Sequence, residues 1–229
     1  HHTAFYADMR DPLALLSGSM GERNLGKYWP YVSDKDEDQD SLKNQESVAE
    51  YSALMSASLP LVADEIVDAY NFSKHQCMLD VGGGQGTFLK RVHEGSPQLK
   101  KMLFDLPGVA QLAAQQLGSN PATLEIQTHG GNFFTDALPA GADLITLVRV
   151  IFDHDDERVL TLLASIYAAL PSGGTLLIAE PMADAPDAQA MGHAYFGFYL
   201  LAMGRGRPRT INEIINLLKK VGFKSVQTV

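Results

Sequence analysis

A stretch with four closely spaced glycines constrains this chain more than any other feature: Met78-Leu79-Asp80-Val81-Gly82-Gly83-Gly84-Gln85-Gly86-Thr87-Phe88. It begins at the end of a short apolar run and leads into a segment with helical spacing, so we predict a strand, a tight turn and a helix. Glycines let the backbone turn sharply after a strand and approach a ligand closely. The pattern is typical of the cofactor loop of a doubly wound α/β sheet.

The spacing of these glycines bears on which cofactor the loop would bind. A dinucleotide fingerprint reads G-x-G-x-x-G, and counting from Gly82 puts Thr87 where the third glycine belongs. The carboxylate of Asp80 suits a cofactor with a positive group better than one with a pyrophosphate. S-adenosylmethionine has a sulfonium, an amino group and no phosphate. For the stretch taken alone, a glycine turn without a ligand stays open as an alternative.

The composition describes an ordinary globular chain and argues against one class of partner. The 229 residues are 45% hydrophobic and 20% charged, which suits one large domain with an extension. The net charge of -9 argues against a general nucleic-acid binder, so we expect no nucleic acid as a partner. The single cysteine, Cys77, fits a reducing compartment and a core position in a strand.

Targeting signals are not visible in the sequence. The first residues lack the pattern of a signal peptide, and no apolar run approaches the ~20 residues of a membrane span. We therefore expect a cytoplasmic location, with peripheral membrane contact as a further expectation. Because the chain starts without Met and ends in what looks like a strand, we expect it to be a fragment of something longer.

Strand and helix patterns alternate from residue 45 onward, which predicts a mainly parallel sheet with helices on both faces. Residues 1–44 are predicted to form a short helical extension and an acidic linker, and residues 45–229 a catalytic domain. The predicted helices cover residues 45–72, 86–94, 109–117, 157–170, 190–203 and 211–221. The predicted strands cover residues 77–81, 101–105, 123–128, 142–150 and 175–180, with a last strand from residue 224.

Ligands of such a sheet bind beyond the carboxyl ends of the strands, and the residues found there are the predicted cofactor contacts. Asp105 follows Gly86 by 19 residues, where a carboxylate can accept hydrogen bonds from both ribose hydroxyls. Asn132 and Phe133 could offer an amide and an aromatic face to adenine. We predict no metal site. The full set of predicted cofactor contacts is Asp80, Gly82, Gly84, Asp105, Leu106, Asn132, Phe133 and Arg149.

Three motifs together resemble those of class I S-adenosylmethionine-dependent O-methyltransferases, in the branch with plant caffeate-type and bacterial small-molecule enzymes. The motifs are Leu79–Gly86, Asp105–Val109 and Pro208–Thr210, and the resemblance runs from roughly Tyr51 to Val229. It implies S-adenosylmethionine as cofactor, S-adenosylhomocysteine as product and a homodimer. Members of this branch usually carry a helical dimerisation region, of which residues 1–32 would be a remnant.

The chain departs from that branch after the fourth predicted strand. Many relatives read K-R-V-L-H-D-W-D-D-E there, with the histidine as general base, whereas here Phe152 takes the base's position and His154 that of the tryptophan. Asn132 also replaces an acidic residue. These departures, together with Ala194–Arg207, resemble the hydroxyneurosporene (demethylspheroidene) O-methyltransferases of phototrophic bacteria. That group methylates the tertiary C1 hydroxyl of acyclic carotenoids.

This resemblance implies an O-methyltransferase for a small, apolar, hydroxylated substrate. A tertiary alcohol is a weak acid, so its proton would leave during or after methyl transfer and needs an acceptor. The predicted catalytic residues are His154 and Asp153, and we expect the neighbouring acids to hold the imidazolium of His154. The predicted substrate contacts are Met55, His193, Phe196, Tyr199 and Met203, with His193 also a third possible base.

Three other functions stay open on the sequence alone. One is a phenol or polyketide O-methyltransferase, which Phe152 disfavours. Another is an oxidoreductase with a nucleotide cofactor, which the missing third glycine and the lack of a Tyr-x-x-x-Lys motif disfavour. The last is a catalytically idle scaffold that keeps the fold, which the loss of the usual base at Phe152 would permit.

Overall fold

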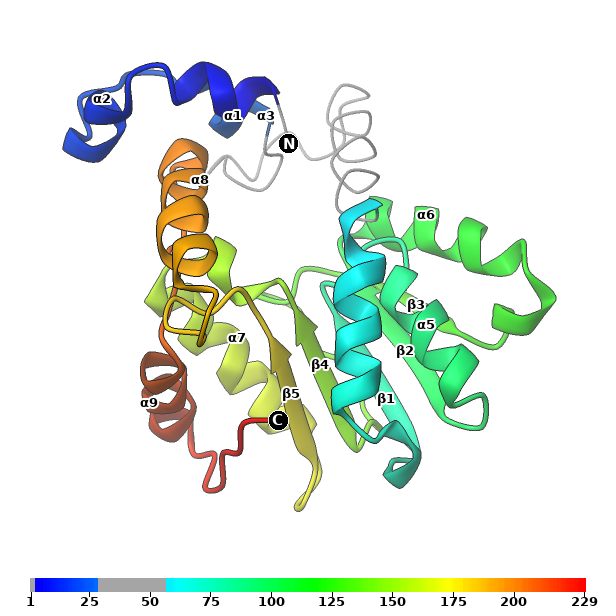
Figure 1. Cartoon of the computed structure of the whole chain (residues 1–229). Helices are drawn as coiled ribbons and strands as arrows, with labels where there is room; N and C mark the ends of the chain where they lie inside the picture. Colours follow the sequence, from blue (N-terminus) through cyan, green and yellow to red (C-terminus); the bar gives the residue numbers. More distant parts are fainter. Residues whose placement is uncertain (1–2, 29–56) are drawn as a thin grey trace. The chain divides into compact units, whose positions relative to one another are not determined.

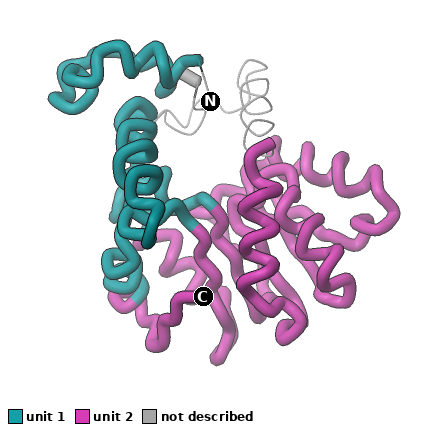
Figure 2. The backbone as a smooth tube through the Cα atoms, viewed as in Figure 1, with its two compact units in different colours: residues 1–51, 149–159, 180–218 teal, residues 52–148, 160–179, 219–229 magenta. Residues whose placement is uncertain are grey.

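The computed structural model describes residues 3–28 and 57–229 (Figure 1). The chain forms two compact units, each assembled from separate stretches of sequence (Figure 2). Residues 1–51, 149–159 and 180–218 make up what we call the helical unit, and residues 52–148, 160–179 and 219–229 the sheet unit. The predicted boundary at residue 44 lies outside the described residues.

The sheet unit contains five parallel strands in the order β3-β2-β1-β4-β5 (Figure 1). The order reverses at β1, which pairs with β2 on one side and β4 on the other. This confirms the predicted fold class, a doubly wound Rossmann-like α/β sheet. The strands are β1 (Cys77–Val81), β2 (Lys100–Asp105), β3 (Gln127–Gly130), β4 (Leu144–Val148) and β5 (Thr175–Ala179).

Burial explains why the central strands read as near-continuous apolar runs. In β4, Leu144, Ile145 and Leu147 are fully buried, as expected for a parallel strand covered on both faces. The helix after the glycine loop, α5 (Thr87–Gly95), contributes Phe88 and Leu89 to the same core. Further elements are the helix over residues 57–69, α6 (Pro107–Gly118) and α7 (Asp156–Ala169).

Short helices dominate the helical unit. α1 (Thr3–Asp8), α2 (Pro12–Ser17) and α3 (Asn24–Tyr28) all contact α8 (Phe196–Met203). The buried carboxylate of Asp8 accepts the backbone N–H groups of Asn24 and Leu25, each at 2.9 Å, and so ties α1 to the start of α3. The unit also includes most of α9 (Ile211–Val221).

Four predicted elements differ from the structure. The predicted helix 190–203 begins as a π-turn (Ala190–Tyr195), and the strand predicted over 123–128 is β3, which starts only at Gln127. The strand predicted over 142–150 ends at Val148, because Arg149 adopts a φ of 58°. The final strand predicted from Lys224 is wrong: residues 224–229 form neither helix nor strand, and most of their side chains are exposed, so they have little to bury against a sheet.

Within residues 3–28 and 57–229, no helix combines the length and the apolar character needed to cross a bilayer.

Candidate active site

The glycine loop after β1 has the backbone that its sequence predicts. Gly82, Gly84 and Gly86 have φ values of 72°, 57° and 79°, a region that side chains disfavour. The N–H of Gly82 donates to the Phe104 carbonyl of β2 at 2.8 Å. A Cβ added to Gly84 would meet no atom within 4 Å, so this face of the loop is open to a ligand.

Two buried carboxyl groups lie against this loop. Asp105 accepts the N–H of Gly84 at 2.8 Å through Oδ2 and the N–H of Leu106 at 2.7 Å through Oδ1. Asp80 accepts the hydroxyl of Thr146 at 2.6 Å. Burial raises the pKa of Asp105 to about 6, and burial, followed by the nearby Asp105, raises the pKa of Asp80 to about 7. The loop therefore combines open backbone with hydrogen-bonded acids.

This donor set fits S-adenosylmethionine better than a dinucleotide. Residues 82–87 contain no Lys or Arg that could neutralise a pyrophosphate. The buried acids Asp80 and Asp105 would instead repel one, while they favour a sulfonium and an amino group. The carboxylate of Asp105 also retains lone pairs for ribose hydroxyls.

The turn after β3 adds the two residues predicted to meet adenine. The N–H of Gly131 donates to the Asp105 carbonyl at 2.9 Å, which fixes the turn beside the end of β2. The side-chain oxygen of Asn132 already accepts the N–H of Phe134 at 3.0 Å, so its NH₂ group is what it can offer a ligand. The rings of Phe133 and Phe134 pack edge to face at 4.6 Å.

In the helical unit, a short turn follows the left-handed Arg149 and carries Phe152 and Asp153. This 3₁₀ turn (Ile151–Asp153) begins where Glu180 Oε1 accepts the N–H groups of Val150 at 2.8 Å and Ile151 at 2.7 Å. Phe152 is buried and lies edge-on to Phe196, with ring centroids 5.8 Å apart. An apolar contact thus occupies the position where the resemblance would place a histidine base.

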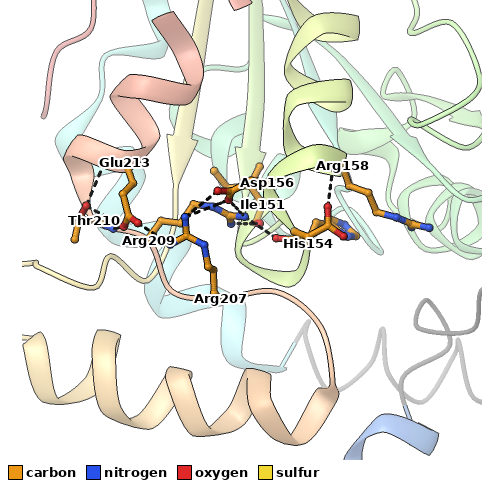
Figure 3. A network of polar contacts seen from close by, with 9 residues as sticks. Ile151, His154, Asp156, Arg158, Arg207, Arg209, Thr210 and Glu213 are labelled. Carbon is orange, nitrogen blue, oxygen red and sulfur yellow. Dashed lines mark hydrogen bonds and ion pairs between the residues drawn. The ribbon is translucent and has the colours of Figure 1, made fainter. Parts of the chain in front are cut away.

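The carbonyl groups of the same turn are held by the segment between α8 and α9 (Figure 3). Arg209, only 2% exposed, donates to the carbonyls of Ile151 and His154 at 2.7 Å each and to Asp156 at 2.8 Å. The N–H of Arg207 donates to the Phe152 carbonyl at 3.0 Å. The turn is therefore fixed at its N–H and its C=O groups. The sequence motif at Pro208–Thr210 indicated a family element but not this contact.

The surroundings of His154 differ from the prediction. Burial, followed by the positive charge of Arg158, lowers the pKa of His154 to about 4, and Asp155 only partly opposes this. The imidazole is therefore neutral at pH 7. Burial first, and the nearby arginines second, therefore act against the imidazolium that acidic neighbours were expected to hold there.

Asp153 forms a pair with Glu180, a residue that sequence reasoning missed. Burial and the charge of Glu180 raise the pKa of Asp153 well above its usual range, and burial raises the pKa of Glu180 to about 7. Arg149 acts in the opposite direction on both. The sequence signal for Glu180 was its place as the last residue of a predicted strand.

The predicted substrate residues divide into three groups. Phe196 and Tyr199 belong to an aromatic cluster, in which the ring of Tyr199 meets that of Phe5 at 5.4 Å. Met203 is 1% exposed and belongs to the core, whereas the side chain of His193 is exposed. Met55 lies outside the described residues. These assignments stay predictions.

Within the part of the chain that the structure describes, no group of three or more His, Cys, Asp and Glu side chains is arranged to hold a metal ion.

Comparison with known proteins gives close matches over almost the whole chain. It is 40% identical over 227 residues to the demethylspheroidene O-methyltransferase of Cereibacter sphaeroides and to that of Rhodobacter capsulatus, which covers 99% of this chain. The match covers 59% and 55% of those proteins, so the chain spans less than two thirds of their length.

Solved structures agree on the fold. Human N-acetylserotonin methyltransferase, solved with S-adenosylmethionine, superposes with a TM-score of 0.81 at 23% identity, over 98% of this chain and 63% of the other. The structure named LaPhzM gives a TM-score of 0.83 at 27% identity, over 98% and 65%. The O-methyltransferase domain family matches residues 37–224, most of the sequence. The chain therefore belongs to the O-methyltransferase domain family.

Proposed function

We propose that this chain is the catalytic part of an S-adenosylmethionine-dependent O-methyltransferase that acts on a hydroxyl group of an apolar small molecule. The observation that carries the proposal is the buried carboxylate of Asp105, hydrogen-bonded to the open glycine loop, in a member of the O-methyltransferase domain family. When bound, S-adenosylmethionine supplies an electrophilic methyl group. Asp105 would hold its ribose, Gly82 and Gly84 would let the methionine portion lie along the backbone, and Asn132 and Phe133 would border adenine.

We propose further that the acceptor is the tertiary C1 hydroxyl of an acyclic carotenoid. The similarity to the two demethylspheroidene O-methyltransferases supports this, because it extends through the segments where this chain departs from the usual histidine pattern. The contact of Phe152 with Phe196 supports it as well, because a phenol would find no imidazole at that position. Phe196 and Tyr199 offer aromatic surface of the kind that a polyene would contact.

The work of the protein in this reaction is mainly alignment and proton removal. Holding the hydroxyl oxygen in line with the methyl carbon can contribute up to about 7–11 kcal/mol of the barrier. A positioned base adds about 10²–10⁴-fold. His154 and Asp153 are the candidates for this base. The low pKa of His154, caused by burial and nearby arginines, makes it the weaker one.

A homodimer and peripheral membrane contact stay predictions for this chain. Exposed apolar side chains on α1 and α2 are the surface that would serve either of them: Tyr6, Leu13 and Leu16 are 52%, 75% and 59% exposed.

The proposal is tested with methyl-labelled S-adenosylmethionine and a panel of acceptors. We expect label in an acyclic carotenoid with a tertiary C1 hydroxyl, presented in detergent micelles, and little or none in a simple phenol or naphthol. Titration calorimetry should show binding of S-adenosylhomocysteine and none of NAD. Binding of NAD alone would exclude methyl transfer. Label in the phenol but not in the carotenoid would assign the chain to the phenol-type enzymes.

A further inference from the structure

Asp153 is a buried residue and Glu180 a partly buried one, and each has one buried oxygen without a hydrogen bond. Asp153 Oδ1 and Glu180 Oε2 have almost no exposed surface and accept no hydrogen bond within the described ranges. Leaving a buried polar atom without a hydrogen bond is unfavourable. Two such atoms in one place indicate a site that a proton or a ligand hydroxyl completes.

Burial and the repulsion between the two carboxylates oppose full ionisation of both groups. Asp153 lies in the 3₁₀ turn, Glu180 follows β5, and each feels the positive charge of Arg149 from the residue directly after β4. Arg149 is one cation for two acids. Two carboxyl groups that share a desolvated site cannot easily both be charged, so the pair retains a proton near neutral pH.

Glu180 also determines where the Asp153 carboxyl group stands. Its Oε1 accepts the N–H groups of Val150 and Ile151, which fixes the first residues of the turn that carries Asp153. Glu180 is thus attached to the backbone by one oxygen while the other is left unpaired. Asp153 Oδ1 and Glu180 Oε2 are alike in having no donor, and Glu180 is in addition tied to the backbone of the turn through its other oxygen.

We propose that Asp153 is the catalytic proton acceptor of the methyl transfer and that Glu180 is its positioning residue, so that this carboxyl pair does the work of the histidine replaced by Phe152. The inference rests on the proposed function.

In the step, the substrate O–H bond breaks and its electron pair stays on oxygen, which forms the new O–CH₃ bond. The bond between sulfur and the methyl carbon breaks with its pair going to sulfur, and the sulfonium becomes a neutral thioether. The proton passes to the carboxylate of Asp153, which becomes a carboxylic acid. A carboxylate is a sufficient base here, because an alcohol oxygen becomes strongly acidic as it acquires the methyl group.

The test uses the full chain, methyl-labelled S-adenosylmethionine and an acyclic carotenoid with a tertiary C1 hydroxyl in micelles. Asp153→Asn should lower kcat by about 10²–10⁴-fold while S-adenosylhomocysteine affinity, measured by calorimetry, stays unchanged. Glu180→Gln should lower kcat less. It should also move the acidic limb of the kcat–pH profile to lower pH, because it removes the negative charge that opposes ionisation of Asp153. A purely structural role for Glu180 would leave that limb in place.

The matched control is Asp184→Asn. Asp184 lies in the same unit, but its carboxylate already accepts the N–H of Ile211 at 2.9 Å, so this variant should keep the wild-type rate and pH profile. A wild-type rate in Asp153→Asn, or a loss found only in His154→Gln, overturns the role of Asp153. If the acidic limb of the kcat–pH profile stays in place in Glu180→Gln, the proposed role of Glu180 is overturned. This measurement does not depend on whether Asp153→Asn folds. Absence of label with the wild-type chain refutes the proposed function itself.

Discussion

Each compact unit contains a pair of acidic side chains with raised pKa values, and the two pairs differ in how their oxygens are used. In the sheet unit, Asp105 accepts two backbone N–H groups and Asp80 accepts the Thr146 hydroxyl. In the helical unit, Asp153 and Glu180 each keep an oxygen that accepts no hydrogen bond from the described residues. Burial raises the pKa of all four carboxyl groups.

A raised pKa therefore does not by itself distinguish the roles of these acids. Their hydrogen bonds distinguish them. Asp105 is held by the loop that it helps to shape, as expected of a group that binds a ligand through a fixed carboxylate. Asp153 has an oxygen free to take up a proton. This difference agrees with the proposals that the sheet-unit pair binds the cofactor and that the helical-unit pair takes up the proton.

Removing one acid from each pair would sharpen this comparison most. Asp105→Ala should weaken S-adenosylhomocysteine binding by roughly 10²–10³-fold, because charge-assisted hydrogen bonds such as those to ribose contribute about 1.5–3 kcal/mol each. Asp153→Asn should leave this affinity unchanged, as measured by titration calorimetry. Similar losses of affinity in both variants would show that both pairs bind the cofactor, and the distinction would fail.

Disturbing the turn that carries Asp153 should affect turnover without affecting cofactor binding. Gly206 has a φ of 77°, and a Cβ there would lie 2.2 Å from the Phe152 carbonyl oxygen. Gly206→Ala should lower the free energy of unfolding by about 3–4 kcal/mol, from backbone strain and overpacking together. It should also reduce kcat, measured by label transfer.

The control for this variant is Gly18→Ala, because Gly18 has a φ of 69° but no atom within 4 Å of its Cβ position. It should show the strain alone, about 1 kcal/mol. If both variants lose the same stability and keep kcat, the turn is not held as described.

The arginines that hold the same turn should differ in importance. Arg209→Met should lower the free energy of unfolding by about 3 kcal/mol, because it leaves two carbonyl groups without this donor and removes one of the two arginines that pair with Asp156. Arg207→Met should cost less than about 1 kcal/mol, because this side chain is 42% exposed and its ion pairs are solvated. Denaturant titration of both variants tests this, and equal effects would contradict the assigned difference in burial.

The pH dependence of stability compares the two pairs directly. Because burial raises the folded-state pKa to about 6 for Asp105 and to about 7 for Glu180, the folded chain keeps protons that the unfolded chain releases above pH ~4. The free energy of unfolding should therefore fall as pH rises from about 4 to about 7. We expect a lower Tm at pH 8 than at pH 5, by a few degrees in order of magnitude.

Variants separate the contributions within this pH range. Asp105→Asn should flatten the part of the Tm profile below about pH 6, and Glu180→Gln should also flatten the part up to about pH 7. A profile that neither variant alters would mean that neither carboxyl group has the raised pKa.

The cofactor loop was predictable because its requirements are local. Left-handed backbone at Gly82, Gly84 and Gly86 requires glycine, so the sequence itself records the turn. Alternating strands and helices then placed Asp105 at a strand end beside that loop. The predicted family and the predicted α/β fold, which rested on these local patterns, are both confirmed.

The turn that carries Phe152 and Asp153 was less predictable because distant residues create it. Arg149 adopts a left-handed conformation that no local rule assigns to arginine. The turn after it is held by Glu180, about 30 positions further on, and by Arg209, whose contact with Ile151 spans 58 positions. The low pKa of His154 likewise depends on burial and on arginines from several segments. Such contacts leave no periodic signal in the sequence.

The π-turn before α8 has a consequence for how chains of this kind can change over time. A π-turn contains one residue more per turn than an α-helix, and Gly192 holds it in place because any side chain there would overlap the Met182 carbonyl. Deleting a single codon in this turn would restore the α-helical repeat and rotate the side chains on one flank by about 100°. Phe196 would then leave Phe152, and Tyr199 would leave Phe5. A difference of one residue in this segment between related chains should therefore change which aromatic rings meet.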